Sequence, residues 1–317
     1  MGIMKISHVS LSVLDIEACT HHYEMVLGMR ITHRDAAGRV FMKCWDEWDK
    51  YSLILTPSDR AGLNHIAYKV EHDADLDVLG KRLRDAGVST EMIAAEAIPF
   101  CGRALGFRLP SGQLMYLVAQ KECVGREVGA LNPDPWPDSR RGAGAQWLDH
   151  CLLLGELNPE LGINRVVDTS ELLIGALDFH MSERMMYGPD ASVLGGAFMF
   201  RGAKPHDIAI FGAATSGFHH MAFYLEDWNA VLHAADIMGK NRVNVESPPN
   251  RHGVTRGLTI YFFDPSGIRN ETFGGLGYAA YPDMPVISWT PETAERAYFF
   301  HTLKPLESFA TVYSPVF

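Results

Sequence analysis

The stretch His252–Glu271 reads H-G-V-T-R-G-L-T-I-Y-F-F-D-P-S-G-I-R-N-E. Its centre, residues 258–263, is rich in β-branched and aromatic side chains and predicts a strand. The Asp-Pro-Ser-Gly sequence that follows predicts a turn, and a second short strand, residues 268–273, then carries Glu271. Because successive strand residues face opposite ways, Arg269 and Glu271 share one face. A carboxylate on a buried face needs a partner, which another part of the chain has to supply.

The chain contains an internal repeat. Residues 63–70, L-N-H-I-A-Y-K-V, resemble residues 218–225, F-H-H-M-A-F-Y-L, and each segment is followed by a helical pattern and a later Pro-Ser-Gly turn. His65 and His220 both precede the proline of that turn by 45 residues. Matching spacings together with matching local patterns predict a tandem duplication of one α+β unit.

The two copies differ at a position that matters for chemistry. Each begins with a strand that carries a histidine, His8 in I-S-H-V-S-L-S and His150 in L-D-H-C-L-L-L. The residue 51 positions after the second shared histidine is Tyr116 in the first copy and Glu271 in the second. Two imidazoles and a carboxylate with open positions are the facial triad of non-haem Fe(II) oxygen chemistry. We therefore predict a metal site in the second copy, with the ligands His150, His220 and Glu271, and a structural copy of it in the first.

Residue 219 is also a histidine, so the ligand in this strand has to be chosen. The repeat aligns His220, and not His219, with His65. Because strand residues alternate between two faces, His219 is then expected on the opposite face, as a hydrogen-bonded packing residue.

The length of 317 residues suggests two domains. Residues 129–145 are rich in Pro, Gly and Ala, which is typical of a linker. We therefore place an N-terminal non-catalytic repeat domain at residues 1–130, a linker at 131–145 and a C-terminal catalytic domain at 146–317.

Charge and cysteine content exclude several classes of protein. The net charge of -10 and the pI of about 5.8 argue against nucleic acid and anionic membrane surfaces as partners. The five cysteines are scattered without a CxxC pair, which indicates neither a disulfide framework nor a thiolate zinc site. The N-terminus enters a strand pattern at once instead of the apolar core of a signal peptide, and no apolar run reaches membrane-spanning length. These features predict a cytoplasmic protein.

The sequence resembles the type I extradiol ring-cleavage dioxygenases of the vicinal oxygen chelate superfamily, and among them the catechol 2,3-dioxygenases. Three stretches carry the resemblance, which covers nearly the whole chain: residues 252–273, residues 30–53 (R-I-T-H-R-D-A-A-G-R-V-F-M-K-C-W-D-E-W-D-K-Y-S-L) and residues 101–112 (C-G-R-A-L-G-F-R-L-P-S-G). The resemblance implies an α+β fold of tandem βαβββ modules that form two cup-like half-barrel domains, with the metal in the C-terminal cup.

The resemblance also implies roles for individual residues. His206, in K-P-H-D-I-A-I, matches the acid–base histidine of the family, and His252 and Tyr261 match residues that contact the bound catechol. Phe198 and Phe309 would line an apolar pocket for the ring. The implied cofactor is Fe(II), with Mn(II) as the alternative, and the implied co-substrates are a catechol and O₂. The family forms homo-oligomers, commonly tetramers.

Without the resemblance, each of the three catalytic candidates also has an interpretation that involves no catalysis. His206 could be a loop residue, His252 a turn residue and Tyr261 a part of the core. Three rival functions remain at this point. They are an extradiol dioxygenase for a bulkier catechol such as 2,3-dihydroxybiphenyl, a metal-dependent glyoxalase-like isomerase, and a protein of the same fold that binds aromatic drugs. A complete set of metal ligands counts against the drug-binding protein, and the three catalytic candidates count against the isomerase.

Overall fold

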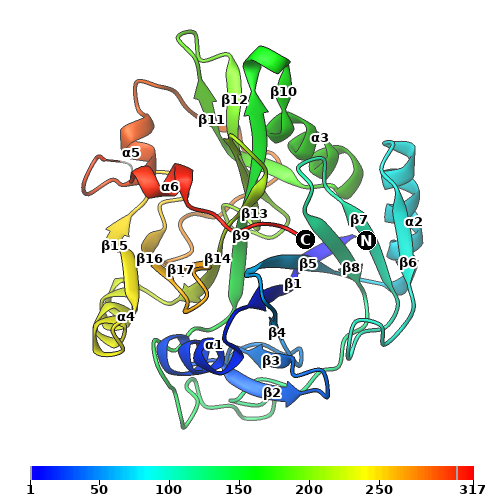
Figure 1. Cartoon of the computed structure of the whole chain (residues 1–317), viewed down its shortest axis with the longest axis vertical. Helices are drawn as coiled ribbons and strands as arrows, with labels where there is room; N and C mark the ends of the chain where they lie inside the picture. The colour runs from blue at the N-terminus through cyan, green and yellow to red at the C-terminus, as the bar shows by residue number, and fades with distance from the viewer. Residues whose placement is uncertain (1, 305) are drawn as a thin grey trace.

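Two β-sheets lie side by side in the computed structural model, which describes residues 2–304 and 306–317. The first half of the chain builds an eight-stranded sheet and the second half a ten-stranded sheet (Figure 1). Helices are few and pack against the sheets, so the α+β class predicted from the sequence is confirmed. None of the helices in the described ranges is long and apolar enough to cross a membrane.

The N-terminal sheet has the strand order β2-β3-β4-β1-β5-β8-β7-β6. Its strands are β1 (Ile3–Val13), β2 (Arg30–Arg34), β3 (Val40–Lys43), β4 (Leu53–Pro57), β5 (Gly62–Val70), β6 (Thr90–Ile93), β7 (Ala104–Arg108) and β8 (Leu114–Val118). The helices of this half are α1 (Ile16–His22), which continues as a π-helix (Tyr23–Leu27), and α2 (Asp73–Asp85).

The C-terminal sheet has the order β15-β16-β17-β14-β9-β13-β12-β11-β18, and a short β10 pairs with β9. Its strands are β9 (Leu148–Asn158), β10 (Ile163–Asn164), β11 (His180–Tyr187), β12 (Val193–Phe200), β13 (Ile208–Ala213), β14 (Gly217–Leu225), β15 (Asn244–Arg251), β16 (Leu258–Phe263), β17 (Arg269–Gly274) and β18 (Ile287–Trp289). The helices are a 3₁₀ turn (Pro159–Leu161), α3 (Arg165–Leu177), α4 (Trp228–Lys240), α5 (Ala294–Tyr298) and α6 (Glu307–Thr311).

The duplication extends to the register of the strands. In the first half β5 runs parallel to β8 and pairs Ala67 with Tyr116; in the second half β14 runs parallel to β17 and pairs Ala222 with Glu271. The antiparallel pairs β1/β5 and β9/β14 occupy the centre of each sheet. Each half is therefore a pair of βαβββ modules, as predicted, and equivalent residues of the two halves occupy equivalent positions.

Helix α3 has no counterpart among the elements expected from the sequence. Asn164 caps it, because its side-chain oxygen accepts hydrogen bonds from the backbone N–H groups of Val166 and Val167. The helix packs against β9, β12 and β13, while α4 covers β15, β16 and β17. With helices on one face and the cup interior on the other, every residue of β14 is buried.

The segment that joins the two sheets folds back onto the first half. The backbone N–H groups of Ala143 and Ala145 donate to the carbonyls of Val26 and Leu27. Gly28 makes this close approach feasible, since a Cβ at this position would come within 2.1 Å of the Arg141 carbonyl oxygen. The segment is thus a packed connection and not a free spacer.

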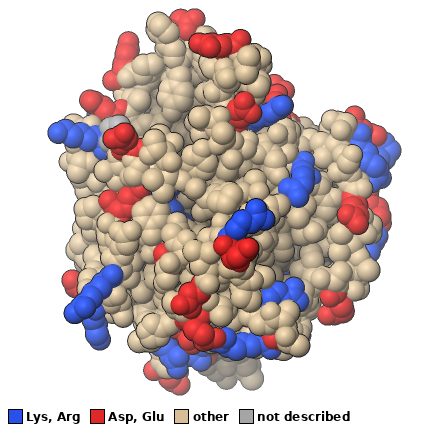
Figure 2. Space-filling view, in the orientation of Figure 1, with Lys and Arg blue, Asp and Glu red and all other residues tan. Residues whose placement is uncertain are grey.

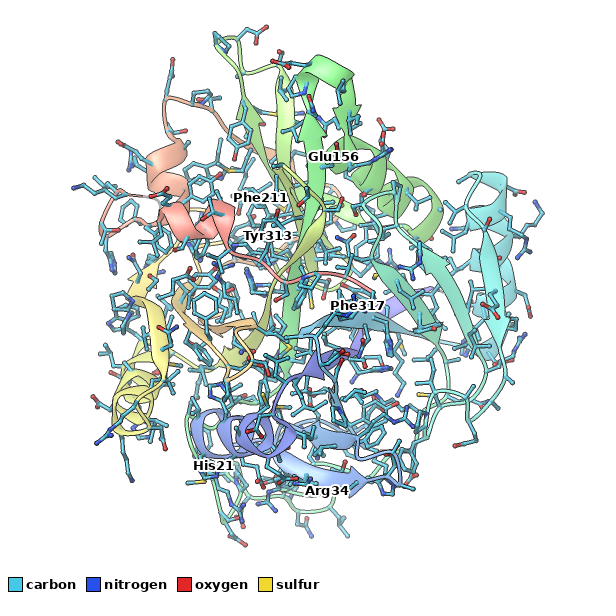
Figure 3. The ribbon with its side chains drawn as sticks, in the orientation of Figure 1. His21, Arg34, Glu156, Phe211, Tyr313 and Phe317 are labelled. Carbon is cyan, nitrogen blue, oxygen red and sulfur yellow. The ribbon has the colours of Figure 1, made fainter. Side chains whose placement is uncertain are left out.

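The C-terminal segment crosses the open side of the second cup. Helices α5 and α6 (red in Figure 1) lie over this cup, and the chain then runs to the junction of the two sheets. There Ser314 pairs with Phe218 and Val316 pairs with Leu63. Figure 3 labels Tyr313, which belongs to this segment, and Phe211 near the middle of the view. Acidic and basic side chains are interspersed on the face in Figure 2.

Candidate metal centre and active site

Three side chains from three neighbouring strands converge inside the second cup. His150 comes from β9, His220 from β14 and Glu271 from β17, and one ligand atom of each lies within 4.8 Å of the others. The Nε2 atoms of His150 and His220 lie 3.1 and 3.0 Å from the same carboxylate oxygen, Oε2 of Glu271. All three side chains are at most 2% exposed.

This arrangement fits a bound metal ion. The Nε2 atom of His220 is buried and has no hydrogen-bond partner within the described ranges, although it faces Glu271. Burial acts to raise the pKa of Glu271, but the neighbouring His150, His220 and His252 hold it well below its usual range. Burial lowers the pKa of His220 to about 4, so its imidazole is neutral near pH 7. Burial acts to lower the pKa of His150, but its contacts with the carboxylates of Asp149 and Glu271 raise it, so a metal ion bound to His150 would compete with a proton for its Nε2 atom. Two imidazoles and an ionised carboxylate form a donor set suited to a divalent transition metal.

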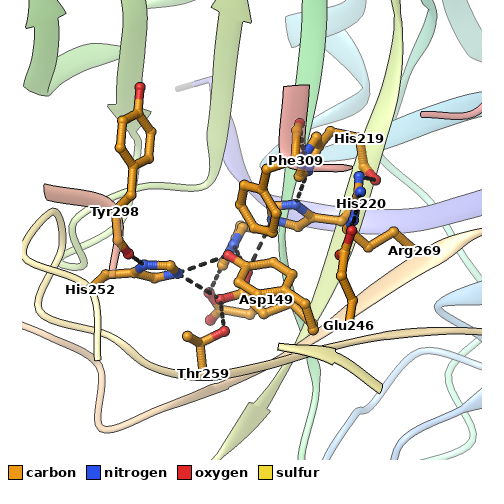
Figure 4. Close-up of polar contacts among 12 residues, drawn as sticks. Asp149, His219, His220, Glu246, His252, Thr259, Arg269, Tyr298 and Phe309 are labelled. Atoms are coloured by element: carbon orange, nitrogen blue, oxygen red, sulfur yellow. Dashed lines mark hydrogen bonds and ion pairs between the residues drawn. The ribbon is translucent and has the colours of Figure 1, made fainter. Parts of the chain in front are cut away.

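His252 and Tyr261 form a hydrogen-bonded pair beside the carboxylate of Glu271. Figure 4 shows His252 with its contact to Tyr298. The Nδ1–H of His252 donates to the carbonyl of Tyr298, so its Nε2 atom accepts from the hydroxyl of Tyr261 at 2.8 Å. Nε2 of His252 also lies 3.5 Å from Oε1 of Glu271. Thr259 donates to that same oxygen at 2.6 Å, which fixes the orientation of the carboxylate.

His206 lies against the first ligand histidine. Its ring centroid is 3.9 Å from that of His150, and Phe198 and Phe273 pack against it at 5.4 and 5.7 Å. Burial and the neighbouring His150 lower the pKa of His206 well below its ordinary value. Its Nδ1 atom is buried without a hydrogen-bond partner in the described structure. A neutral imidazole with a free nitrogen is able to accept a proton from a bound ligand.

An apolar cavity of about 220 Å³ opens above these polar groups. Phe309 of α6 contributes one wall, where its ring contacts Tyr261 at a centroid distance of 4.5 Å. At the other end of the cavity, the hydroxyls of Tyr187 and Tyr298 lie 2.5 Å apart. The remaining lining is apolar and includes Leu152, Leu154, Phe198, Phe211 and Phe273.

All eight site residues predicted from the sequence line this one cavity: His150, Phe198, His206, His220, His252, Tyr261, Glu271 and Phe309. The sequence reasoning did not identify Asp149, whose carboxylate accepts the Nδ1–H of His150 at 2.8 Å, or Thr259. The sequence did contain an indication of the role of Asp149. A carboxylate directly before a ligand histidine in a buried strand needs a hydrogen-bond partner, and the histidine is the nearest candidate.

The expectation for His219 was wrong in one respect. Its hydrogen bonds are present, but the side chain lines the cavity and its Nδ1 atom lies 2.6 Å from Nδ1 of His220. The register of β14 against β9 shifts between Phe218 and His220, which is the signature of a β-bulge. A bulge interrupts the alternation of side chains, so neighbouring residues can approach the same side.

Comparisons with known proteins agree with the fold. The family model described as Catechol 2,3-dioxygenase-like N-terminal domain matches residues 63–122. The model described as Glyoxalase/Bleomycin resistance protein/Dioxygenase superfamily matches residues 162–272. Paired βαβββ modules around a two-histidine, one-carboxylate centre place the chain in the vicinal oxygen chelate class.

The similarity to individual proteins extends over almost the whole chain. Metapyrocatechase of Pseudomonas sp. (strain CF600) is 36% identical over 313 residues, which are 98% of both chains. The crystal structure of a 2,3-dioxygenase from Pseudomonas sp. KL28 is 40% identical, with a TM-score of 0.87, over 92% of this chain and 99% of that one. A manganese-dependent 2,3-dihydroxybiphenyl 1,2-dioxygenase of Geobacillus genomosp. 3 is 26% identical over 90% of both chains. The chain belongs to the extradiol dioxygenase family.

Proposed function

We propose that this protein cleaves the ring of catechol and of simple alkyl- or chloro-substituted catechols with O₂ at the bond beside the two hydroxyls, giving a 2-hydroxymuconic semialdehyde. One observation carries the proposal: the converging ligand atoms of His150, His220 and Glu271 form one end of an apolar cavity whose other polar groups include His206, His252 and Tyr261. The 36% identity to metapyrocatechase over nearly the full length supports it.

The proposed metal is Fe(II), held by His150, His220 and Glu271. When bound, a redox-active divalent metal would bring catechol and O₂ together and allow the electron transfer that their different spin states otherwise hinder. Zinc lacks an accessible redox change and does not suit this chemistry. Mn(II) is the alternative, because a relative that is 26% identical is manganese-dependent.

The protein side chains would position the catechol and move its protons. His252 and Tyr261 already share a hydrogen bond next to Glu271, and a catechol oxygen placed between them would gain partners that favour its ionised form. His206 would accept a proton from a catechol hydroxyl and return it when the ring opens, since burial keeps its imidazole neutral. The apolar walls would exclude water from the reacting atoms.

The cavity supports a small substrate. Its volume of about 220 Å³ lies below the roughly 300–1,000 Å³ typical of sites for drug-sized ligands. Phe198 and Phe309 would contact the ring of a monocyclic catechol. A biphenyl would have to displace part of this wall, so we place catechol ahead of 2,3-dihydroxybiphenyl.

An oxygen-uptake assay tests the proposal. Protein purified without air and loaded with Fe(II) should consume O₂ on addition of catechol and form the yellow semialdehyde, and parallel loading with Mn(II) identifies the preferred metal. We expect a higher kcat/KM for catechol than for 2,3-dihydroxybiphenyl. Absence of O₂ uptake by the Fe(II)-loaded and the Mn(II)-loaded protein would exclude a dioxygenase and favour the glyoxalase-like reaction.

We further propose the arrangement of the chain around this activity. Residues 1–130 would support the catalytic domain at 146–317, with 131–145 between them. We also infer a homo-oligomer, with a tetramer favoured by the resemblance to the family; exposed apolar side chains near the connection, Leu131 at 86% and Trp136 at 45%, are consistent with association. Light scattering of the purified protein would measure the mass, and a monomer at micromolar concentration would contradict this inference.

A further inference from the structure

We infer that the residue directly before each histidine ligand sets the tautomer of that ligand, and that this pair of residues, Asp149 and His219, separates a metal-binding cup from a cup without metal. The inference rests on the proposed metal centre at His150, His220 and Glu271. A neutral imidazole offers a metal its unprotonated nitrogen, so the proton has to be held on the other nitrogen by an acceptor.

Asp149 provides that acceptor for His150. Its Oδ2 atom lies 2.8 Å from Nδ1 of His150, and a carboxylate can only accept. The ionised form is secured by Lys204, whose ammonium lies 3.1 Å from Oδ1, and by the indole N–H of Trp147 at 3.1 Å. The proton of His150 therefore stays on Nδ1, and the lone pair of Nε2 points towards Glu271.

His219 provides the acceptor for His220 through a two-step chain. Nε2 of His219 lies 2.9 Å from the carbonyl oxygen of Phe309, which can only accept, so this nitrogen carries the proton of His219. Its Nδ1 atom is then an acceptor, and it lies 2.6 Å from Nδ1 of His220. His220 donates from Nδ1 and keeps a lone pair on Nε2, the atom that faces Glu271 at 3.0 Å. The carbonyl that begins this chain belongs to α6, the helix that covers the cavity.

The first cup provides an internal comparison. Ser7 stands where Asp149 stands, and the hydroxyl of Ser7 and the ammonium of Lys121 lie 3.2 and 3.3 Å from Nδ1 of His8. An ammonium can only donate, and Lys121 also donates to the Ser7 hydroxyl at 3.2 Å, so that hydroxyl is left to donate to His8 in turn. Nδ1 of His8 must then accept, and its proton moves to Nε2. Nε2–H of His8 then donates a hydrogen bond to Nε2 of His65, 3.0 Å away, so neither nitrogen has a free lone pair for a metal.

The residue before the second histidine also differs between the two cups, and again only the second cup has an acceptor there. Asn64 stands where His219 stands, and its amide bonds to Ser12 at 2.9 Å and to Ser10 at 3.4 Å. It therefore supplies no acceptor to His65. The histidines of the first cup are thus paired with each other, and replacement of Tyr116 by a carboxylate would not by itself free their lone pairs.

Metal affinity tests the inference without reference to catalysis. Metal-free protein is titrated with Mn(II), and the unbound ion is measured by electron paramagnetic resonance. Asp149→Ser and His219→Asn introduce the residues of the first cup, and we expect each to weaken Mn(II) binding by roughly 10- to 100-fold. Asp149→Asn retains an acceptor oxygen and should recover part of the affinity.

Three controls separate this role from a structural one. Ser7→Ala and Asn64→Ala change the equivalent positions of the first cup and should leave the Mn(II) affinity within about twofold. Thermal unfolding of each metal-free variant verifies that it is folded. The double variant Asp149→Ser/Lys204→Met also removes the ammonium, which in the single variant keeps Asp207 at 3.3 Å as a partner, so a loss of affinity that persists in the double variant is not caused by that ammonium.

Two readouts address the first cup. Nitrogen-15 NMR of the imidazoles should show His8 protonated on Nε2, and Tyr116→Glu should still bind one Mn(II) per chain. A folded Asp149→Ser variant with wild-type affinity, an Nδ1–H tautomer at His8, or a second Mn(II) bound by Tyr116→Glu would each overturn the inference. Failure of the wild-type protein itself to bind Mn(II) or Fe(II) would instead refute the proposed metal centre.

Discussion

Arg269 anchors the C-terminal segment over the active site, and its replacement by methionine should loosen that segment. The guanidinium is buried and makes two hydrogen bonds, of 2.6 and 2.7 Å, to the carboxylate of Glu246. It also donates to the carbonyls of Val312 at 2.7 Å and Ser308 at 3.0 Å, at the two sides of Phe309. A single side chain thus joins β17 to β15 and to the cover of the cavity.

The expected cost of Arg269→Met follows from burial. Glu246 is 6% exposed and would be left as a buried charge without its partner. Removal of one member of a buried ion pair costs about 3–5 kcal/mol of unfolding free energy, a large share of the roughly 5–15 kcal/mol available to a folded protein. Loss of the two carbonyl bonds adds a local effect, because it frees the segment around Phe309.

A double variant separates the two effects. Arg269→Met/Glu246→Leu removes both charges, and apolar replacement of a buried ion pair is often neutral or stabilising. We therefore expect most of the unfolding free energy to return in the double variant. The carbonyls of Ser308 and Val312 remain without the guanidinium in both variants, so the C-terminal segment should stay loosened in both.

Urea unfolding measures the global effect, and limited proteolysis between residues 300 and 313 measures the local one. The single variant should lose about 3–5 kcal/mol, and cleavage of the segment should be faster in both variants than in the wild type. A double variant as unstable as the single one would show that charge burial is not the cause. Unchanged cleavage in both variants would show that Arg269 does not hold the segment.

Glu271→Gln should lose the metal and the activity, whereas Tyr116→Phe should retain both; metal analysis of the two proteins decides, and loss of metal from Tyr116→Phe would move the site to the first cup. His206→Phe should keep the metal but slow turnover by roughly 10²–10⁴, and an unchanged kcat would assign proton transfer elsewhere. Burial, opposed by hydrogen bonds from the backbone and from Tyr23, raises the pKa of Asp264 from 3.8 to about 6. The folded state therefore keeps a proton that the unfolded state has released, so the contribution of Asp264 to stability should fall as the pH rises from about 4 to 6, by up to about 3 kcal/mol. Buried histidines such as His22 and His65, whose pKa values burial lowers to about 4 and about 3, act in the opposite direction. The test is therefore the difference in unfolding free energy between the wild type and Asp264→Asn, measured by urea unfolding at several pH values.

The candidate metal centre was predictable because its three residues lie in equivalent strands of the two copies. The 45- and 51-residue spacings identified which residues of the two copies correspond, and the structure confirms the correspondence through the pairing of Ala67 with Tyr116 and of Ala222 with Glu271. Chemistry then selected the second copy, since a tyrosine does not replace the carboxylate in this type of centre.

Other features were not predicted from the sequence, because their sequence signals were weak or depended on distant parts of the chain. Helix α3 begins at the single cap Asn164 within a segment that the repeat did not mark. The position of His219 depends on a bulge in β14, and strand alternation alone predicts the opposite face. The orientation of Glu271 depends on Thr259, which reaches it across the β16/β17 pair.

Strand periodicity, turn chemistry and spacing are local properties of the chain, and they were enough to predict the duplicated α+β units, the three candidate ligand positions and the family. The tertiary structure decided which nitrogen of each ligand histidine carries the proton, the size of the cavity and the cover provided by Phe309. These properties arise from contacts such as that of His219 with the Phe309 carbonyl, 90 residues away. A hydrogen-bond partner so distant along the chain is fixed when the sheets and the C-terminal segment pack together.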